Sequence, residues 1–363
     1  MKKKKNFSSR KNLKTINSTN TVLQVNPTVL PARPENLNFF AEIIEYNLNS
    51  FSSKVLNSFD ELKAYLNSGN ITWVNISGLS TDEVEKLSLA FGIHPLITED
   101  ILSIGQRPKM DEINGLLFCL LNMLYFNNET CEVEPEQVSI VLGANFVITF
   151  QEESQRDVFS SLREKIKVNG SKLRQNKADF LFYSLIDAIV DHYFVTMEQL
   201  GDNIENLEEE IIHFSDKESL SKINNLRKEM IVLKRNISPV RELVGGIMRS
   251  DTEMIEDRTI KYFKDVYDHI IQANDLSENY RDMMINLQDL YLSNVNLKLN
   301  EVMKVIAIVT CLMAPAAVIG GIFGMNFDKI PLLHNQWGFY ISVAIMLLVP
   351  VAMVFAFKKR GWF

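Results

Sequence analysis

Residues 305–327 read VIAIVTCLMAPAAVIGGIFGMNF, a stretch that contains no Asp, Glu, Lys or Arg. A second uncharged apolar stretch, residues 337–357, follows after a short loop. At about 1.5 Å of rise per residue, each stretch is long enough to cross the ~30 Å hydrocarbon core of a bilayer as a helix. The sequence therefore predicts a membrane protein whose C-terminal end is a two-helix transmembrane hairpin.

Basic residues flank this predicted hairpin and indicate its orientation. Lys298 and Lys304 precede the first span, and the basic segment 358–363 follows the second. Because Lys and Arg are enriched on the cytoplasmic side, we expect both termini in the cytoplasm and residues 327–336 as a periplasmic loop of an inner-membrane protein. The three cysteines have no metal-type spacing, which agrees with reduced cytosolic thiols.

The N-terminal segment, residues 1–35, is predicted to be a basic disordered tail. Residues 1–34 carry eight Lys or Arg and no Asp or Glu. The polar run at residues 7–12 stands where a signal peptide would have its apolar core. Such a composition cannot bury enough apolar surface to fold alone. Two roles stay open for it, contact with anionic lipid and solubilisation without a partner.

Between the tail and the spans, the sequence predicts an α+β cytoplasmic domain, an α/β sandwich, at residues 36–165. A helical hairpin at 166–255 and a long stalk helix at 256–326 follow, and the stalk helix continues into the first span at about 303–323. Apolar runs predict strands over residues 41–45, 71–76, 116–125, 137–142 and 145–150, the last two turning at Gly143-Ala144, and helices over 60–66 and 81–91.

Apolar residues three and four apart predict two helix-packing seams after residue 179. The first contains Ile223, Leu226, Met230, Leu233, Ile237, Val240 and Val244. The second contains Leu276, Tyr280, Met283, Leu287, Leu290, Asn294 and Leu297. Because neither Pro nor Gly occurs between Arg258 and Met313, we expect one uninterrupted helix that reaches Pro315 and beyond.

A stripe of polar and then small residues runs beside the second seam into the predicted span. Its members are Asp282, Asn286, Asp289, Ser293, Asn296, Asn300, Met303, Ile306 or Ala307, Thr310, Ala314, Ala317 and Gly321. We interpret it as the face where copies of the chain surround a shared axis, with an apolar constriction at Met303 and Ile306 that gates by dewetting. The alternative is a solvated surface followed by close helix packing. Because two spans cannot enclose a pore, transport requires an oligomer.

Asn326 ends the first span, where a buried amide without partners would be costly. In a ring of subunits, its amide oxygen and the carbonyls of Gly324 and Met325 would hold the water shell of a cation. Mg²⁺ suits such a ring because it dehydrates reluctantly. A divalent ion entering a negative cell gains about 4.6 kcal/mol per 100 mV, so no other energy source is needed. The sequence offers no P-loop, triad or zinc motif, and we expect no enzyme.

Residues 323–327, FGMNF, resemble the YGMNF signature that closes the first span of CorA-type magnesium channels. The segments HPLITEDI (94–101), QRPK (106–109), SLIDA (184–188), YFKDVYDH (262–269) and NEVMKV (300–305) are also similar to segments of this family. The resemblance extends from about Asn36 to the C-terminal end. It implies a homopentameric, funnel-shaped channel in membrane lipid that takes up Mg²⁺, with Co²⁺ as a further cation. We expect no nucleic-acid partner.

The resemblance also assigns roles to single residues. It implies that Gly324, Met325 and Asn326 form the selectivity filter. It places pore and gate positions at Asp289, Asn300, Met303 and Ile306, with Thr310, Ala314, Ala317 and Gly321 continuing the stripe. It implies regulatory Mg²⁺ sites between subunits at Asp100 and Asp265, helped by Glu99 and Asp187. Facing carboxylates repel, and a divalent cation removes that repulsion, so ion loss would let the subunits separate and the gate open.

Two positions depart from the family pattern. Leu332 stands where the loop often has an acid, which leaves Asp328 as the loop's carboxylate, and Ala317 stands where Thr is common. With fewer carboxylates in the loop, the electrostatic attraction of cations to the outer end of the pore is weaker, so the identity of the transported ion stays open. Uptake of Co²⁺ or Ni²⁺ and transport of Zn²⁺ on the same fold are therefore alternatives, and a membrane-anchored scaffold without cation flux is an alternative of another class.

Overall fold

The computed structural model describes the chain except for residues 1–39, 57–68, 154–155, 327–329, 333–334 and 363. The predicted tail and the predicted helix at 60–66 lie outside the described residues. The chain divides into two compact units, Met1–Gln288 and Asp289–Phe363.

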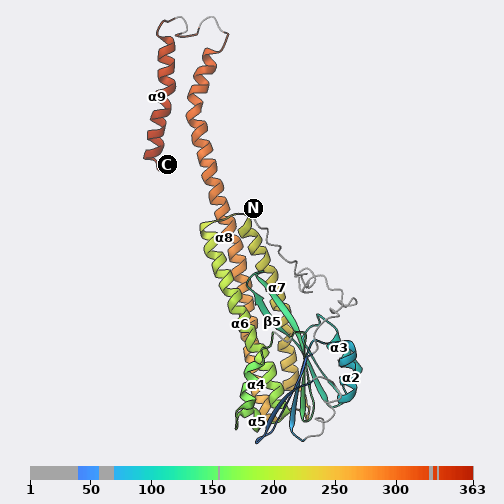
Figure 1. The fold of residues 1–363 in the computed structure, drawn as a ribbon. Coiled ribbons are helices and arrows are strands. Elements are labelled where there is room, and N and C mark those ends of the chain that lie inside the picture. Colours follow the sequence, from blue (N-terminus) through green and yellow to red (C-terminus); the bar gives the residue numbers. More distant parts are fainter. Residues whose placement is uncertain (1–39, 57–68, 154–155, 327–329, 333–334, 363) are drawn as a thin grey trace, which may run out of the picture. The chain divides into compact units, whose positions relative to one another are not determined.

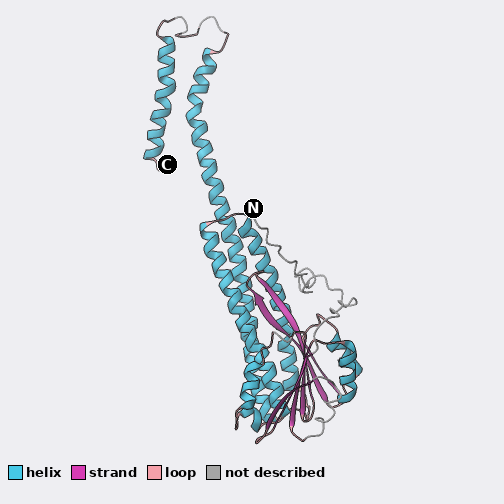
Figure 2. Ribbon diagram, in the orientation of Figure 1, coloured by secondary structure: helices cyan, strands magenta, loops and turns pink. Residues whose placement is uncertain are grey.

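A mixed sheet forms the centre of the first unit (Figure 2). Its described strands are β1 (Phe40–Tyr46), β2 (Phe51–Leu56), β3 (Ile71–Ser77), β4 (Lys109–Ile113), β5 (Leu116–Asn127), β6 (Glu132–Leu142) and β7 (Phe146–Gln151). They lie in the order β2-β1-β3-β7-β6-β5-β4. The β3–β7 pair is parallel, and the other neighbouring pairs are antiparallel.

Helices cover both faces of this sheet (Figure 1). The described helices are α2 (Thr81–Phe91), α3 (Pro95–Leu102), α4 (Ser160–Lys167), α5 (Lys172–Gln175), α6 (Ala178–His213), α7 (Lys217–Arg249), α8 (Asp257–Phe323) and α9 (Gly338–Lys359). Because side chains alternate along a strand, Val74 and Ile76 join the core under α2 and α3. Trp73 points to the other face, where its ring lies 6.0 Å from that of Phe159 beside α4. The sheet therefore separates α2 and α3 from the long helices.

Most predicted elements are confirmed. Strands β1, β3 and β5 contain the predicted segments, β6 and β7 turn over Gly143-Ala144, and α2 has the predicted bounds. The predicted boundary between residues 165 and 166 falls inside α4. Helix α8 is continuous from Asp257 to Phe323, through Pro315. The fold class is thus an α+β domain joined by a long helix to a pair of apolar helices.

The first predicted seam is confirmed and the second is displaced. All seven members of the α7 seam are buried. On α8, however, Leu276, Tyr280 and Met283 are only half-buried and Leu297 is exposed. Of the predicted members, Leu287 is buried, and the other buried positions of α8 are Thr259, Phe263, Val266, Ile270, Ala273, Ser277, Met284, Tyr291 and Ile308. The small side chains of Ala273 and Ser277 allow another helix to pack closely. Because the predicted seam was based on large apolar residues, it did not include these two positions.

Three described helices, α6, α8 and α9, are long and apolar enough to cross a membrane. The apolar window of α6 is 61% buried within the protein, whereas the windows of α8 and α9 are 6% buried. Helix α6 is therefore a core helix of the first unit. Helices α8 and α9 expose the apolar surface that a bilayer would cover, which confirms the predicted hairpin of two spans.

Glu136 on β6 is a buried carboxylate with an unusual proton affinity. Its Oε1 accepts the backbone N–H groups of Glu152 and Glu153 at 3.1 and 2.9 Å. Burial raises the pKa of Glu136 from 4.5 to about 8, and the charges of Glu152 and Glu153 add to this. Because the folded state holds the proton more tightly than the unfolded state, folding is favoured below pH 4.5, and this advantage disappears as the pH rises towards 8.

We expect Glu136→Gln to raise the melting temperature of the full-length protein, with a gain that grows from pH 6 to pH 8.5. Gln keeps the acceptor for both amides and carries no charge, so ~1–4 kcal/mol of desolvation cost is removed at the alkaline end. Thermal unfolding in detergent across this pH range measures it. The exposed Glu129→Gln is the matched control. A gain independent of pH would contradict a buried, proton-binding Glu136.

Candidate functional site

The polar and small stripe of α8 is exposed along its whole length in the single chain. Its predicted pore and gate members are exposed without exception: Asp289, Asn300, Met303, Ile306, Thr310, Ala314, Ala317 and Gly321. The Thr310 hydroxyl donates to the Ile306 carbonyl of its own helix at 2.8 Å, so it needs no partner from outside. This helix therefore presents a continuous face that no described residue of the same chain covers.

Helix α9 approaches α8 beside the stripe and leaves the stripe open. A Cβ placed on Gly320 would meet the Met346 Cε of α9 at 4.0 Å. A Cβ placed on Gly321, a stripe position, would meet nothing within 4 Å. Close packing within the hairpin thus uses the neighbouring glycine, and the face containing Gly321 stays available to a partner or to water.

The Gly-Met-Asn segment closes the end of α8. The N–H of Gly324 donates to the Gly320 carbonyl at 3.0 Å, and the N–H of Met325 donates to the Ile322 carbonyl at 3.3 Å. A Cβ on Gly324 would lie 3.2 Å from the Gly320 oxygen, so a side chain there would press on this last turn. Gly324, Met325 and Asn326 are all exposed. The Asn326 amide therefore stands just beyond the helix end, within reach of solvent.

Asp100 and Glu99 lie on α3, on the face of the sheet opposite the long helices. The Asp100 carboxylate contacts Lys109 Nζ at 2.6 Å and accepts from Gln106 Nε2 at 2.9 Å. Glu99 is exposed. Asp100 thus already has a cationic partner in its own chain, whereas Glu99 is open to an outside ligand.

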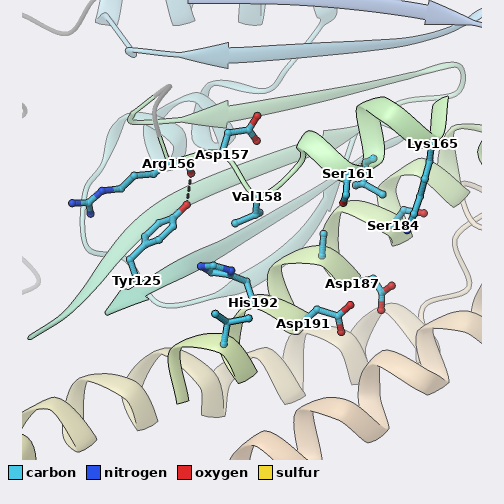
Figure 3. Close-up of a pocket in the computed structure, with 13 residues that line it drawn as sticks. Tyr125, Arg156, Asp157, Val158, Ser161, Lys165, Ser184, Asp187, Asp191 and His192 are labelled. Atoms are coloured by element: carbon cyan, nitrogen blue, oxygen red, sulfur yellow. Dashed lines mark hydrogen bonds between the residues drawn. The ribbon is translucent and has the colours of Figure 1, made fainter. Parts of the chain in front are cut away.

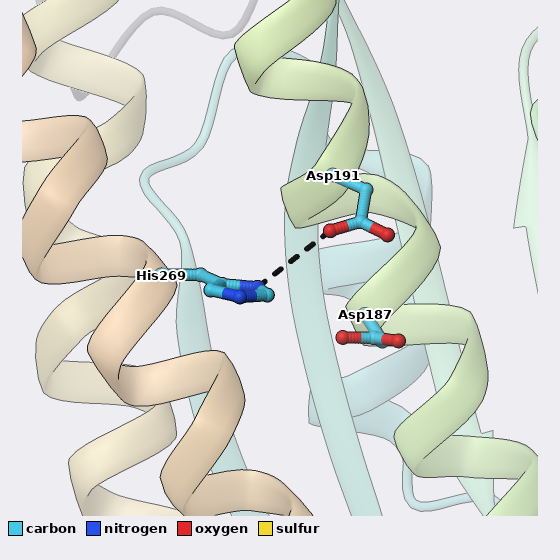
Figure 4. Close-up of side chains that lie close together, drawn as sticks. All are labelled: Asp187, Asp191 and His269. Carbon is cyan, nitrogen blue, oxygen red and sulfur yellow. Dashed lines mark ion pairs between the residues drawn. The ribbon is translucent and has the colours of Figure 1, made fainter.

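Asp187 on α6 and Asp265 on α8 lie near each other on the bundle side. Burial raises the pKa of Asp187, and the charges of Asp191 and Asp265 raise it further. Tyr183 donates its hydroxyl to Asp187 Oδ2 at 3.2 Å. Ligand atoms of Asp187, Asp191 and His269 lie within 4.8 Å of one another (Figure 4). This is the one group of three metal-ligating side chains among the described residues.

A cavity of about 580 Å³ adjoins the two aspartates of α6 (Figure 3). Asp187 and Asp191 line one side, and Tyr125, Arg156 and His192 line another. Burial lowers the pKa of His192, which favours its neutral form. The Arg156 guanidinium pairs with Glu134 at 2.5 Å, so its charge is balanced within the chain. The acidic edge of the cavity is therefore the part open to a cation.

The predicted metal residues form two pairs in the structure, and the two pairs lie apart from each other. Asp187 and Asp265 come from adjacent helices, while Asp100 and Glu99 stand across the sheet from them (Figure 1). Within a single chain these two sets cannot share an ion. The sequence reasoning missed Asp191 and His269. The four-residue spacing of Asp187 and Asp191 on one helix was the available signal.

Comparisons with known proteins identify the family. The family model described as "CorA-like Mg2+ transporter protein" matches residues 68–359. The chain belongs to this family. It is 40% identical over 325 residues to "Cobalt/magnesium transport protein CorA" of Thermotoga maritima, covering 89% of this chain and 92% of that one. It is 31% identical over 291 residues to "Putative metal ion transporter YfjQ" of Bacillus subtilis, covering 80% and 89% of the two chains.

Solved structures of the CorA family agree with this fold. The complete CorA magnesium transporter from Methanocaldococcus jannaschii matches with a TM-score of 0.73 and 23% identity, covering 90% of this chain and 99% of that one. At this identity the match shows the fold alone. It confirms the predicted arrangement of an α+β domain, a long helix and terminal apolar helices. The CorA family consists of membrane transporters, which agrees with the two exposed apolar helices, each long enough to span a bilayer.

Proposed function

We propose that the chain is a passive channel for the uptake of Mg²⁺ across the inner membrane, with Co²⁺ as a second substrate. The observation that carries the proposal is the exposed stripe of α8 that ends at Gly324-Met325-Asn326. The relative from Thermotoga maritima is a cobalt/magnesium transport protein, which supports the choice of ions. Because two spans cannot enclose a pore, we propose a homopentamer in which five copies of α8 surround the axis.

Ion selection takes place at the outer end of α8. A ring of Asn326 amide oxygens accepts hydrogen bonds from the waters of Mg²⁺, and the backbone carbonyls of Gly324 and Met325 add further acceptors. The ion keeps its water shell, because the free energy needed to dehydrate Mg²⁺ exceeds the free energy gained from direct contact with neutral oxygen atoms. The membrane potential supplies about 4.6 kcal/mol per 100 mV for a divalent cation.

The gate lies at the cytoplasmic end of the membrane span. Met303 and Ile306 are both 59% exposed in the single chain, and five copies of each narrow the bore with apolar side chains. Such a constriction blocks ions by excluding water. The ion then reaches Asp289 and Asn300, which lie on the stripe before Met303, on the cytoplasmic side of the gate.

Internal Mg²⁺ holds the channel closed by bridging subunits. Carboxylate oxygens are the ligands that Mg²⁺ prefers, and Asp265, Asp187 and the exposed Glu99 fit this requirement. Asp100 fits it once its carboxylate releases Lys109. The bridge therefore joins the α3 face of one subunit to the α6–α8 face of the next, and ion loss leaves the facing carboxylates to repel.

Aromatic residues support the membrane placement and the cytoplasmic termini. The rings of Trp337 and Tyr340 lie 6.1 Å apart at the start of α9, and those of Phe357 and Trp362 stack at 5.2 Å near its end. Trp and Tyr concentrate at the two membrane–water boundaries, and basic residues concentrate on the cytoplasmic side. Lys358 and Lys359, in the last turn of α9, fit a cytoplasmic end.

A flux assay with the purified full-length protein in liposomes tests the proposal. An inside-negative potential should drive Mg²⁺ entry without ATP, and Co²⁺ should compete with it, whereas Zn²⁺ and Ni²⁺ should compete less. No cation flux would favour the membrane-anchored scaffold. Zn²⁺ or Ni²⁺ flux that exceeds Mg²⁺ flux would replace the proposed substrate on the same fold.

A further inference from the structure

We propose that an apolar and basic segment of the chain's own N-terminal tail, residues 29–33, docks in a groove between α2 and α3. The segment reads VLPAR, and the groove has a volume of about 560 Å³. The two helices lie side by side on one face of the sheet (Figure 1). The occupant thus comes from the part of this chain that precedes the described residues. Docking does not depend on transport by the protein.

Apolar side chains form the walls of the groove. They come from both helices and from the turn between them: Leu89, Ile93, Pro95 and Leu102. Leu89 is 85% exposed in the single chain, the highest value among the large apolar residues that the structure describes. Covering such a side chain with an apolar segment removes its surface from water, which is favourable. The groove is therefore suited to a ligand with apolar groups.

Two carboxylates and one hydroxyl also line the groove. Glu85 on α2 and Glu99 on α3 are exposed, and neither forms an ion pair with a described residue. The hydroxyl of Ser88 is buried and has no hydrogen-bond partner among the residues that the structure describes. A buried hydroxyl without a partner is unfavourable, and a backbone group of a docked segment would satisfy it. The groove therefore favours a peptide that is both apolar and basic.

The charges of the helices and of the tail are complementary. The two helices carry five carboxylates against one lysine, a net charge of −4: Asp82, Glu83, Glu85, Glu99 and Asp100 against Lys86. Residues 1–34 carry eight Lys or Arg and no Asp or Glu. Opposite net charges favour association, and a covalent connection raises the effective concentration of the tail at the groove. Both effects favour the chain's own tail over a separate ligand.

The tail joins the described fold next to this groove. Phe40 begins β1 and pairs with Ser77 at the end of β3, and α2 begins four residues after Ser77. Ala41 and Ile43 of β1 belong to the core under α2 and α3. Ten residues separate Leu30 from Phe40 and span up to about 33 Å when extended, whereas α2 is about 16 Å long. The segment can therefore reach the groove.

The direction of the chain decides which residue of the tail meets which part of the groove. Glu85 is nearer the start of α2 than Leu89, and the start of α2 is nearer the point where the tail joins β1. Arg33, the residue of the segment nearest to β1, therefore pairs with Glu85, and Leu30 covers Leu89. This arrangement leaves Glu99 open to the proposed Mg²⁺ bridge.

Disulfide trapping in the full-length protein tests the docking. In a background without the native cysteines, Leu30→Cys is combined with Leu89→Cys, and the purified protein is oxidised in detergent. We expect most molecules to form this disulfide within one chain, which non-reducing gels and mass spectrometry identify. The control combines Leu30→Cys with Leu48→Cys, because Leu48 is 60% exposed just beyond the other end of β1, within reach of an undocked tail. Its yield should be at least 5-fold lower.

Charge reversal distinguishes recognition from random contact. Adding Glu85→Lys to the pair at positions 30 and 89 should reduce the yield at least 5-fold, because Arg33 then meets a like charge. Glu129→Lys, an exposed position between β5 and β6, should leave the yield unchanged. Melting temperatures show that each variant is folded.

Three results would overturn the docking. The first is no disulfide between positions 30 and 89, or an equal yield at position 48. The second is a disulfide that forms only between chains, which would assign the groove to a second copy. The third is an unchanged yield in the folded Glu85→Lys variant. Cation flux enters none of these measurements, so they succeed or fail separately from the proposed channel function.

Discussion

Replacing Asn326 by alanine is expected to abolish Mg²⁺ uptake into liposomes. The variant removes the amide oxygen that stands beyond the end of α8 in every subunit. Each amide–water hydrogen bond is worth roughly 0.5–1.5 kcal/mol, and a ring loses one per subunit, so we expect uptake to fall about 100-fold or more. Flux driven by a membrane potential measures the effect.

A second amide close by provides the control for Asn326→Ala. Gln336 is an exposed amide of the same connecting loop, and it is not part of the proposed ring. Gln336→Ala should retain most of the flux, and size-exclusion chromatography should show the same assembly for both variants. Flux at the wild-type level through an assembled Asn326→Ala channel would contradict the assignment of Asn326 to the selectivity filter.

Asp265→Lys is expected to make closure far less dependent on internal Mg²⁺. The new ammonium group would face the carboxylates of the neighbouring subunit and replace the ion that offsets their repulsion. We expect the internal Mg²⁺ concentration that closes the channel to change at least 10-fold, with flux measured while internal Mg²⁺ is varied.

Another aspartate on the same helix separates this effect from a general change of charge. Asp268 is exposed on α8, three residues after Asp265, so Asp268→Lys introduces the same charge change near the site. It should leave the Mg²⁺ dependence close to that of the wild type. Unchanged inhibition in Asp265→Lys, or an equal shift in both variants, would contradict the assignment of Asp265.

Much of the fold could be predicted because its strongest signals are local. Each of these signals depends only on residues close together in the sequence. They are the uncharged apolar runs, the absence of Pro and Gly between Arg258 and Met313, and the seam of α7. Strand β4 was missed although Asn114-Gly115, with φ of 56° and 71°, is a typical hairpin turn between β4 and β5. The polar, short β4 gives no apolar run. The α8 seam was misplaced because its small buried residues have no hydropathy signal.

The candidate site could be predicted only in part because its remaining members depend on packing between helices. Asp187 came from the family resemblance, and the structure adds Asp191 and His269 from the convergence of α6 and α8. Nothing in the local sequence shows that residues 191 and 269 meet. The ion pair of Asp100 with Lys109 also escapes sequence reasoning, because it depends on how α3 meets β4.

Disulfide cross-linking at positions 303 and 305 tests most directly whether copies of α8 surround a common axis. Met303 and Val305 are equally exposed in the single chain, at 59%, but two residues on a helix differ by about 200° in direction. In a background without Cys119, Cys131 and Cys311, we expect Met303→Cys to form cross-linked dimers in membranes and Val305→Cys to stay monomeric. Cross-linking at 305 alone, or at neither position, would contradict the central claim.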